Sequence, residues 1–233
     1  MCIRDRPYDV ENYRVTGYKA QEALPVSSWR SVGASQNAFF HESMIDELAH
    51  SKSIDPMQMR LELISHDASH KVLQAVKQMS GWGTTLKTGH FQGLAFCMSF
   101  GVPTAEVVEI KLENNNVKIV KVFAAIDVGT ALDPRNIEAQ VLGGINFGLA
   151  AAMSGEITVQ NGQVQQTNFH NFTSMRLNQS PEIEVKVLEN GTKIRGIGEP
   201  GTPPAAPALA NAIFAATGKR IRELPLNKHI SFL

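Results

Sequence analysis

The chain has 233 residues, and its 22 Lys and Arg residues balance 22 Asp and Glu residues, for a formal net charge of zero. This balance disfavours charge-driven binding to nucleic acid or to an anionic membrane. Hydrophobic residues make up 43% of the chain and charged residues only 19%, against about 25% charged residues in a typical soluble domain. We therefore expect a well-filled core and some surface that lies against other protein. No stretch approaches the ~18 consecutive apolar residues of a membrane helix, so no membrane span is predicted.

The cysteine content limits the metal chemistry of the chain. Cys2 and Cys97 are its two cysteines, too few for a disulfide framework, a four-thiolate zinc site or an iron–sulfur cluster. A redox metal would have to come with a cofactor or with a partner subunit.

The first third of the chain is predicted to be helical. Apolar residues recur at helical spacing within residues 36–50, which indicates an amphipathic helix. Asp55 and Pro56 supply a capping side chain and a proline at the first helical position, which predicts a second helix over residues 57–64. A third helix is expected over residues 69–79, before a glycine-containing turn.

The middle of the chain is predicted to be rich in strands. Runs of Val and Ile over residues 105–112 and 117–126 flank an Asn-rich turn and indicate a β-hairpin. Asp133 and Pro134 repeat the pattern of cap and proline and open a helix that runs to residue 153. The glycines at 143, 144 and 148 each cost this helix about 1 kcal/mol relative to Ala, so we expect something to approach its backbone closely.

The last third mixes short strands with a loop and a helix. A second hairpin is expected over residues 157–160 and 164–168, and a further strand over residues 183–188. A Gly- and Pro-rich loop over residues 195–207 leads into a final helix over residues 208–217, which Gly218 ends. The chain therefore reads as one continuous α+β unit.

Residues 196–201 match the pattern G-x-G-x-x-G, which alone would suggest a dinucleotide phosphate loop. We reject this interpretation, because such a loop leads directly into a helix, whereas Pro200, Pro203 and Pro204 remove N–H donors and delay the helix. The same prolines stiffen a loop that carries one acidic side chain, Glu199. Glu199 is thus a candidate general base, and an ordinary surface loop is the simpler alternative on these residues alone.

Other local patterns are weaker. His66 and His70 have the spacing of two metal ligands on a helix, but they lack a third ligand and a zinc site is disfavoured. We treat His41 and Glu42 as helix surface. The segment from Arg30 to Gln36 could grip an oxygen or an anion through backbone N–H groups at a helix start, or could be a plain helix cap formed by Ser35.

Taken together, the order of these segments resembles the molybdenum-cofactor-binding large subunit of the xanthine oxidase and aldehyde oxidoreductase family, and most closely its isoquinoline 1-oxidoreductase beta-subunit branch. The resemblance is carried by six ordered motifs: Trp29-Arg30-Ser31-Val32-Gly33, residues 40–49, Asp127-Val128-Gly129 with Asp133-Pro134, Gln140 with Gly143-Gly144, Asn168-Phe169-His170, and residues 196–209. It implies the α+β molybdopterin-binding domain, with mixed sheets and packed helices. Residues 11–233 are then the C-terminal part of that domain, and residues 1–10 a non-native or linker start.

The resemblance also implies roles for individual residues. Glu199 corresponds to the catalytic base beside molybdenum. The cofactor-binding residues implied are Arg30, Ser31, Val32, Gly33, Gln36, Gln140 and Gly198. No protein side chain need ligate the metal, since the pterin dithiolene holds it in this family. The implied reaction is hydroxylation of an aldehyde or N-heteroaromatic C–H with oxygen derived from water.

The implied cofactor is molybdopterin, in its cytosine dinucleotide form, and the implied partner is a small subunit that carries [2Fe–2S] clusters. Because large subunits of this family are several times longer, we expect an N-terminal half of the same subunit to be missing and the fragment to be inactive alone. The sequence does not decide between a periplasmic and a cytoplasmic location. The alternative is a scaffold of the same fold that binds a pterin or a partner without turnover. The enzyme hypothesis predicts that Glu199 is buried in a cleft and faces Arg30 and Gln140.

Overall fold

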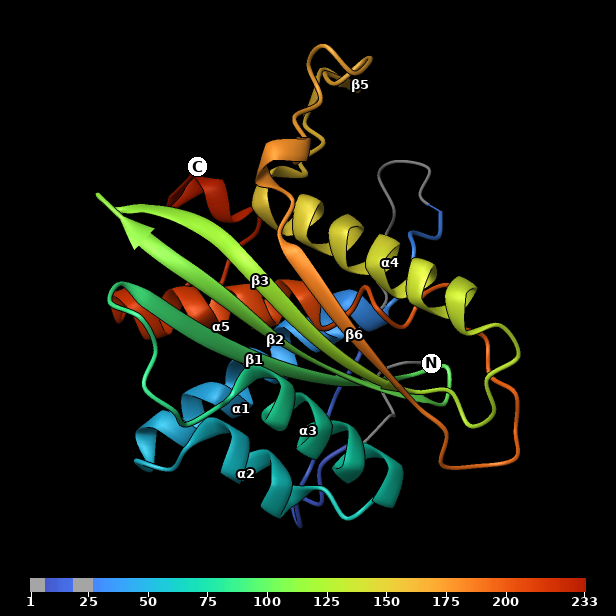
Figure 1. The fold of residues 1–233 in the computed structure, drawn as a ribbon. Helices are drawn as coiled ribbons and strands as arrows, with labels where there is room; N and C mark the ends of the chain where they lie inside the picture. Colours follow the sequence, from blue (N-terminus) through green and yellow to red (C-terminus); the bar gives the residue numbers. More distant parts are fainter. Residues whose placement is uncertain (1–6, 19–26) are drawn as a thin grey trace.

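The structure, a computed structural model, describes residues 7–18 and 27–233 (Figure 1). Its centre is a mixed sheet in the order β1-β2-β3-β6. Strands β1 (His90–Ser99), β2 (Val102–Glu113) and β3 (Asn116–Asp127) are antiparallel, and β6 (Glu182–Leu188) runs parallel to β3. The short strand β7 (Ser231–Phe232) also pairs with β3. The predicted hairpin and the predicted strand at 183–188 are confirmed.

Strand β1 was not predicted from the sequence. Its central residues 93–96 are all buried, so the alternation that marks a half-exposed strand is missing. Gly93 explains how this edge strand is covered, because a Cβ at this position would lie 2.0 Å from the backbone nitrogen of Ala212. The final helix therefore packs with its backbone almost against β1.

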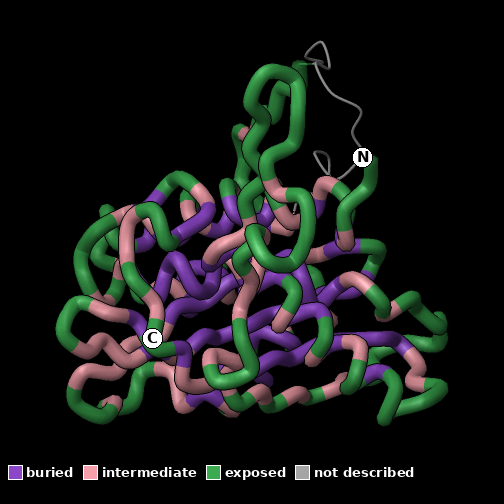
Figure 2. Tube along the Cα trace, turned by 90° about the horizontal axis from the view of Figure 1, so that it is seen from above, coloured by how far each residue is buried: buried purple, intermediate pink, exposed green. Residues whose placement is uncertain are grey.

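Helices cover both faces of the sheet. Helices α2 (Pro56–Leu63) and α3 (Asp67–Ser80) pack on one face, and α4 (Pro134–Ser154) and α5 (Ala205–Thr217) on the other, with α1 (Ala34–Ser51) beside β1 and α5 (Figure 1). The buried residues form two apolar clusters, one on each side of the sheet. Figure 2 shows the buried segments in the interior and the exposed ones at the periphery. The predicted α+β architecture with a mixed sheet and packed helices is confirmed. None of the described helices is both long and apolar enough to cross a membrane.

The helix starts follow the capping signals in the sequence. Asp55 accepts hydrogen bonds from the N–H groups of Met57 and Gln58, and Asp133 accepts one from Asn136. His66 occupies the same position at α3, where its Nδ1 accepts the N–H of Ser69. This imidazole thus has a capping role, and within the described residues no three His, Cys, Asp or Glu side chains gather as a metal-binding group.

Glu42 lies in the interior, so the prediction that His41 and Glu42 form helix surface is wrong for Glu42. Its side chain is 1% exposed and accepts hydrogen bonds from Arg60 Nε at 2.9 Å, from the Phe96 N–H at 2.8 Å and from the hydroxyl of Tyr8. Phe96 belongs to the edge strand β1, whose outward N–H would otherwise lack a partner. A carboxylate can be buried here because it is paired and because it satisfies a strand edge.

The remaining segments lie at the periphery. The predicted second hairpin is confirmed, but its strands β4 (Val159–Gln160) and β5 (Gln163–Val164) are shorter than predicted, since residues 157–158 and 165–168 are not strand. This hairpin projects from the body of the protein (Figure 1). The described residues also form the 3-10 turns η2 (Leu177–Gln179) and η3 (Leu226–Lys228). The domain start at residue 11 stays a prediction. Residues 1–6, which include Cys2, lie outside the described residues. Tyr8 is buried, with 2% of its surface exposed.

Candidate functional site

The loop from Arg30 to Gly33 has an unusual backbone. Ser31 and Val32 have φ angles of 79° and 53°, a region that a β-branched residue rarely adopts and that costs about 1–3 kcal/mol. Hydrogen bonds hold this turn, from the N–H of Val32 to the carbonyl of Trp29 at 2.8 Å and from the N–H of Ala34 to the carbonyl of Ser31 at 2.9 Å. Such local strain is typical of functional loops.

Helix α1 begins directly after this loop without a side-chain cap. The alternative in which Ser35 caps the helix is wrong, because Ser35 lies inside α1 and its hydroxyl hydrogen-bonds that of Ser31. The N–H groups of Ser35 and Gln36, unlike that of Ala34, therefore remain available to another acceptor.

The second loop, which contains Glu199, crosses the backbone of α4. A Cβ on Gly148 would lie 2.7 Å from the carbonyl oxygen of Thr202, and one on Gly144 would lie 3.1 Å from the carbonyl carbon of Gly201. The close approach that we predicted from the α4 glycines is confirmed. Strand β6 ends at Leu188 and α5 begins only at Ala205, so the strand–turn–helix of a dinucleotide loop is not formed around Gly196.

The two loops and α4 meet at one cluster of hydrogen bonds. Arg30 donates from Nε to the carbonyl of Gly198 at 2.8 Å, and its Nη2 donates to the same carbonyl. Nη2 also donates to the backbone carbonyl of Gln140 at 3.3 Å and to its side-chain Oε1 at 3.2 Å. The N–H of Ser31 donates to Oε1 of Glu199 at 2.8 Å. The structure thus brings Arg30, Ser31, Gln140, Gly198 and Glu199 together.

The cluster is more open than the sequence suggested. Glu199 and Gln140 are half-buried, Gly198 is exposed, and Val32 is 48% exposed. The expected convergence is present, but deep burial of Glu199 in a cleft is not. Gln36 is exposed on the first turn of α1 and makes no hydrogen bond with the cluster in the described chain.

Sequence reasoning missed the aromatic wall beside Arg30. The ring of Phe147 on α4 lies 5.9 Å from the guanidinium carbon of Arg30 and 4.8 Å from the ring of Trp29. A signal was present, since Phe147 follows Gly143 by one helical turn and therefore lies on the same face of α4. Gly143 lies beside Arg30, since a Cβ at this position would be in ordinary van der Waals contact with Nη1, at 3.8 Å.

The donors of the site suit an anionic ligand rich in oxygen atoms. They are the N–H groups of Ser35 and Gln36 in the first turn of α1 and the amide group of Gln140, which Arg30 orients. Oxygen atoms of a phosphorylated pterin accept such hydrogen bonds, and the helix start favours negative charge. The residues present therefore fit a pterin cofactor.

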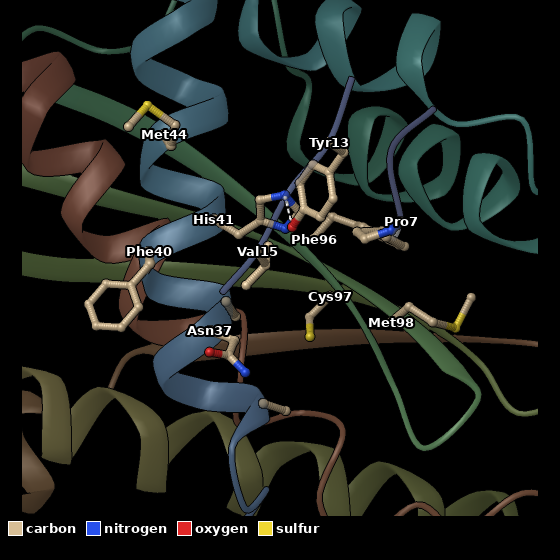
Figure 3. Close-up of a pocket in the computed structure, with 12 residues that line it drawn as sticks. Pro7, Tyr13, Val15, Asn37, Phe40, His41, Met44, Phe96, Cys97 and Met98 are labelled. Carbon is tan, nitrogen blue, oxygen red and sulfur yellow. Dashed lines mark hydrogen bonds between the residues drawn. The ribbon is translucent and has the colours of Figure 1, made fainter. Parts of the chain in front are cut away.

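A separate cavity of about 350 Å³ opens between α1, β1 and the N-terminal segment. Its lining is mainly apolar and includes Phe40, Met44 and Met98, while Tyr13 and His41 form a hydrogen bond at its edge (Figure 3). Burial lowers the pKa of His41, so its imidazole is neutral at pH 7. The cavity begins at Ala34, directly after the loop of Arg30, and suits an uncharged aromatic or aliphatic molecule.

The donors of the cluster fit a cofactor-binding domain, and comparison with known proteins identifies its family. The family model described as "Molybdopterin cofactor-binding domain" matches residues 27–181, about two thirds of the chain. The chain belongs to this family. Glu199 lies beyond the matched region.

Three known proteins show the extent of the similarity. Isoquinoline 1-oxidoreductase subunit beta of Brevundimonas diminuta is 31% identical over 94% of this chain and 29% of its own length. Membrane-bound aldehyde dehydrogenase [pyrroloquinoline-quinone] of Gluconacetobacter polyoxogenes is 29% identical over 95% of this chain and 32% of its own length. The crystal structure of quinoline 2-oxidoreductase from Pseudomonas putida 86 superposes with a TM-score of 0.77 at 12% identity, over 87% of this chain and 52% of that chain. The chain thus spans less than a third of these two curated relatives.

Proposed function

We propose that this chain is the C-terminal, base-bearing part of a molybdenum hydroxylase that oxidises an aldehyde or N-heteroaromatic C–H, with Glu199 as the general base. One observation carries the proposal: the N–H of Ser31 holds Oε1 of Glu199 at 2.8 Å, within the cluster of Arg30, Gln140 and Gly198. A carboxylate fixed through one oxygen has its other oxygen free to accept a proton. The two curated relatives support the class of reaction by their names, isoquinoline oxidoreductase and aldehyde dehydrogenase.

The chain's own residues would divide the work as follows. Ser31 orients the carboxylate, and Oε2 of Glu199 accepts a proton from the water-derived nucleophile as it attacks carbon. Gln140 and the start of α1 offer N–H donors to the pterin. When bound, the molybdenum cofactor supplies the two-electron oxidation, while the protein contributes position and a base.

The cofactor and the partners are part of the proposal. We infer molybdopterin, because the family model names it and the donors fit a phosphorylated pterin. The cytosine dinucleotide form is proposed from the family resemblance alone. The competing cofactor is pyrroloquinoline quinone, which the name of the Gluconacetobacter polyoxogenes relative contains. A small subunit with [2Fe–2S] clusters would take the electrons, and an N-terminal remainder of the same polypeptide would complete the pocket.

The test replaces Glu199 by Gln in the full-length polypeptide with its small subunit. Dye-linked oxidation of an aldehyde and of isoquinoline is measured at equal molybdenum content. We expect kcat to fall by about 10²–10⁴-fold, the typical cost of losing a general base. Glu189→Gln is the matched control, since Oε2 of Glu189 also accepts one backbone N–H, that of Ala131, at 2.8 Å.

Each outcome separates the alternatives. Equal activity of Glu199→Gln and the wild type would place the base elsewhere. A molybdenum-loaded wild type that oxidises neither substrate class would favour the non-catalytic scaffold. Quinone in place of molybdenum in the purified protein would overturn the cofactor assignment.

A further inference from the structure

The guanidinium of Arg30 binds to backbone and amide oxygens and leaves the carboxylate of Glu199 alone. Nε and Nη2 donate to the carbonyl of Gly198, and Nη2 also reaches both oxygens of Gln140. Among the ion pairs of the described residues, none involves Glu199. A cation paired with the carboxylate would lower its basicity, so this arrangement supports the loop without weakening a base.

Two neighbouring residues on one loop bind two neighbouring residues on the other. Arg30 is bonded to Gly198, and Ser31 is bonded to Glu199. Two adjacent connections fix the direction of the second loop as well as its position, whereas one connection would leave it free to turn. We propose that Arg30 is a positioning residue that aligns Glu199 through the carbonyl of Gly198, an inference that rests on the proposed function of Glu199.

The same contact fixes the amide of Gln140. Arginine has donors only, so the side-chain atom of Gln140 that faces Arg30 must be Oε1. Its NH₂ group then points away from Arg30 as a donor. Arg30 thus determines that Gln140 offers N–H groups, rather than an acceptor, to whatever binds beside it.

The surroundings favour the planar fork of arginine over a point charge. The guanidinium lies beside the ring of Phe147 and beside Gly143, both on α4. Lysine has one compact ammonium group and cannot present a planar set of donors to two residues in this way. A role as a simple charge for an anionic cofactor makes the opposite prediction, since lysine would then replace arginine well.

The first measurement needs no turnover. Hydrogen exchange is followed in the full-length protein with its small subunit, for peptides that contain residues 196–203. We expect Arg30→Met to speed the exchange of the Thr202 amide, which donates to the carbonyl of Glu199 at 2.9 Å, by about tenfold or more, because its loop loses an anchor. Arg222→Met is the matched control, since Arg222 is 64% exposed in an ion pair with Glu47, and it should leave this exchange unchanged. Unchanged exchange in Arg30→Met would overturn the proposal.

The second measurement compares kcat and KM of the same variants at equal molybdenum content. We expect Arg30→Met to lower kcat by about 10²-fold with little change in KM, as displacement of a catalytic group by about 1 Å does. Arg30→Lys should stay close to Arg30→Met. Restoration of kcat by lysine would show that Arg30 acts as a charge and would overturn the positioning role.

These outcomes are independent of the test of Glu199. If Glu199→Gln lowers kcat while Arg30→Met behaves like Arg222→Met, the positioning role alone fails. If Glu199→Gln keeps full activity, the proposed function fails whatever Arg30 does.

Discussion

Glu42 and Glu199 are two carboxylates with opposite surroundings. Glu42 joins α1 to α2 and β1, and Glu199 joins its own loop to the loop that precedes α1. Glu42 is 1% exposed and accepts hydrogen bonds from Tyr8, Arg60 and the backbone of Phe96. Glu199 is half-buried, and its carboxylate accepts a single hydrogen bond in the described chain, from the backbone of Ser31. Both oxygens of the Glu42 carboxylate accept hydrogen bonds, whereas only Oε1 of Glu199 does so in the described chain.

This difference separates a structural acid from a candidate catalytic one. A saturated, paired carboxylate stays where it is and cannot easily exchange a proton. A carboxylate held through one oxygen is oriented but can still react. The rigid network around Glu42 lies in the middle of α1, and the reactive loop lies at its start, so one helix connects the two.

Replacement of Arg60 should destabilise the network around Glu42. Arg60 is fully buried, and the nearby acids Glu42 and Asp46 help to raise its pKa. Arg60→Met would leave Glu42 charged and buried without its cation, so we expect a loss of about 3–5 kcal/mol in the free energy of unfolding. Urea unfolding followed by circular dichroism measures this loss. Arg222→Met, in an exposed ion pair, should cost at most about 1 kcal/mol, and an equal loss in both variants would contradict a special role of the buried pair.

Glu106 sharpens the comparison, because it is buried without any donor. It lies on β2 between Ala95 and Ala124 of the neighbouring strands, it is 0% exposed, and both its oxygens lack hydrogen-bond partners in the described chain. Burial raises the pKa of Glu106 well above its ordinary value. Since the folded pKa is the higher one, the wild type keeps its full stability below the unfolded pKa of about 4.3 and loses stability as the pH rises above it.

Glu106→Met should therefore stabilise the protein by about 1–3 kcal/mol at pH 7, since it removes an unsatisfied buried group. The gain over the wild type should grow as the pH rises from about 4.3, which urea unfolding at several pH values would show. Glu113→Met on the same strand is the control, because the side chain of Glu113 is 40% exposed and pairs with Lys111, and it should show no such gain. A pH-independent difference between Glu106→Met and the wild type would mean that Glu106 is not neutral in the folded state.

Much of the fold was predictable because its signals are local. The Asp-Pro pairs at 55–56 and 133–134 predicted two helix starts, and the glycines of α4 predicted a close approach. Strand β1 and the burial of Glu42 were not predictable in this way. Both depend on contacts between distant segments, and burial on both faces erases the alternation that marks a strand.

The candidate site shows the same limit. The prolines around Glu199 indicated a stiff loop with one acid, but nothing local links this loop to Arg30. The hydrogen bonds that join them connect residues 168 positions apart. The family resemblance supplied that connection, whereas the open surroundings of Glu199 and the contact of Arg30 with Phe147 required the structure.

The smallest expected effect concerns the contact between α4 and the loop of Glu199. Gly148→Ala would place a methyl group 2.7 Å from the carbonyl oxygen of Thr202, so the loop must shift by several tenths of an ångström. Because a shift of about 1 Å costs on the order of 10²-fold in rate, we expect kcat to fall by about tenfold. Gly196→Ala is the control in the same loop, since a Cβ there would meet nothing within 4 Å. Equal rates for the two variants, at equal molybdenum content, would mean that the close packing on α4 does not position Glu199.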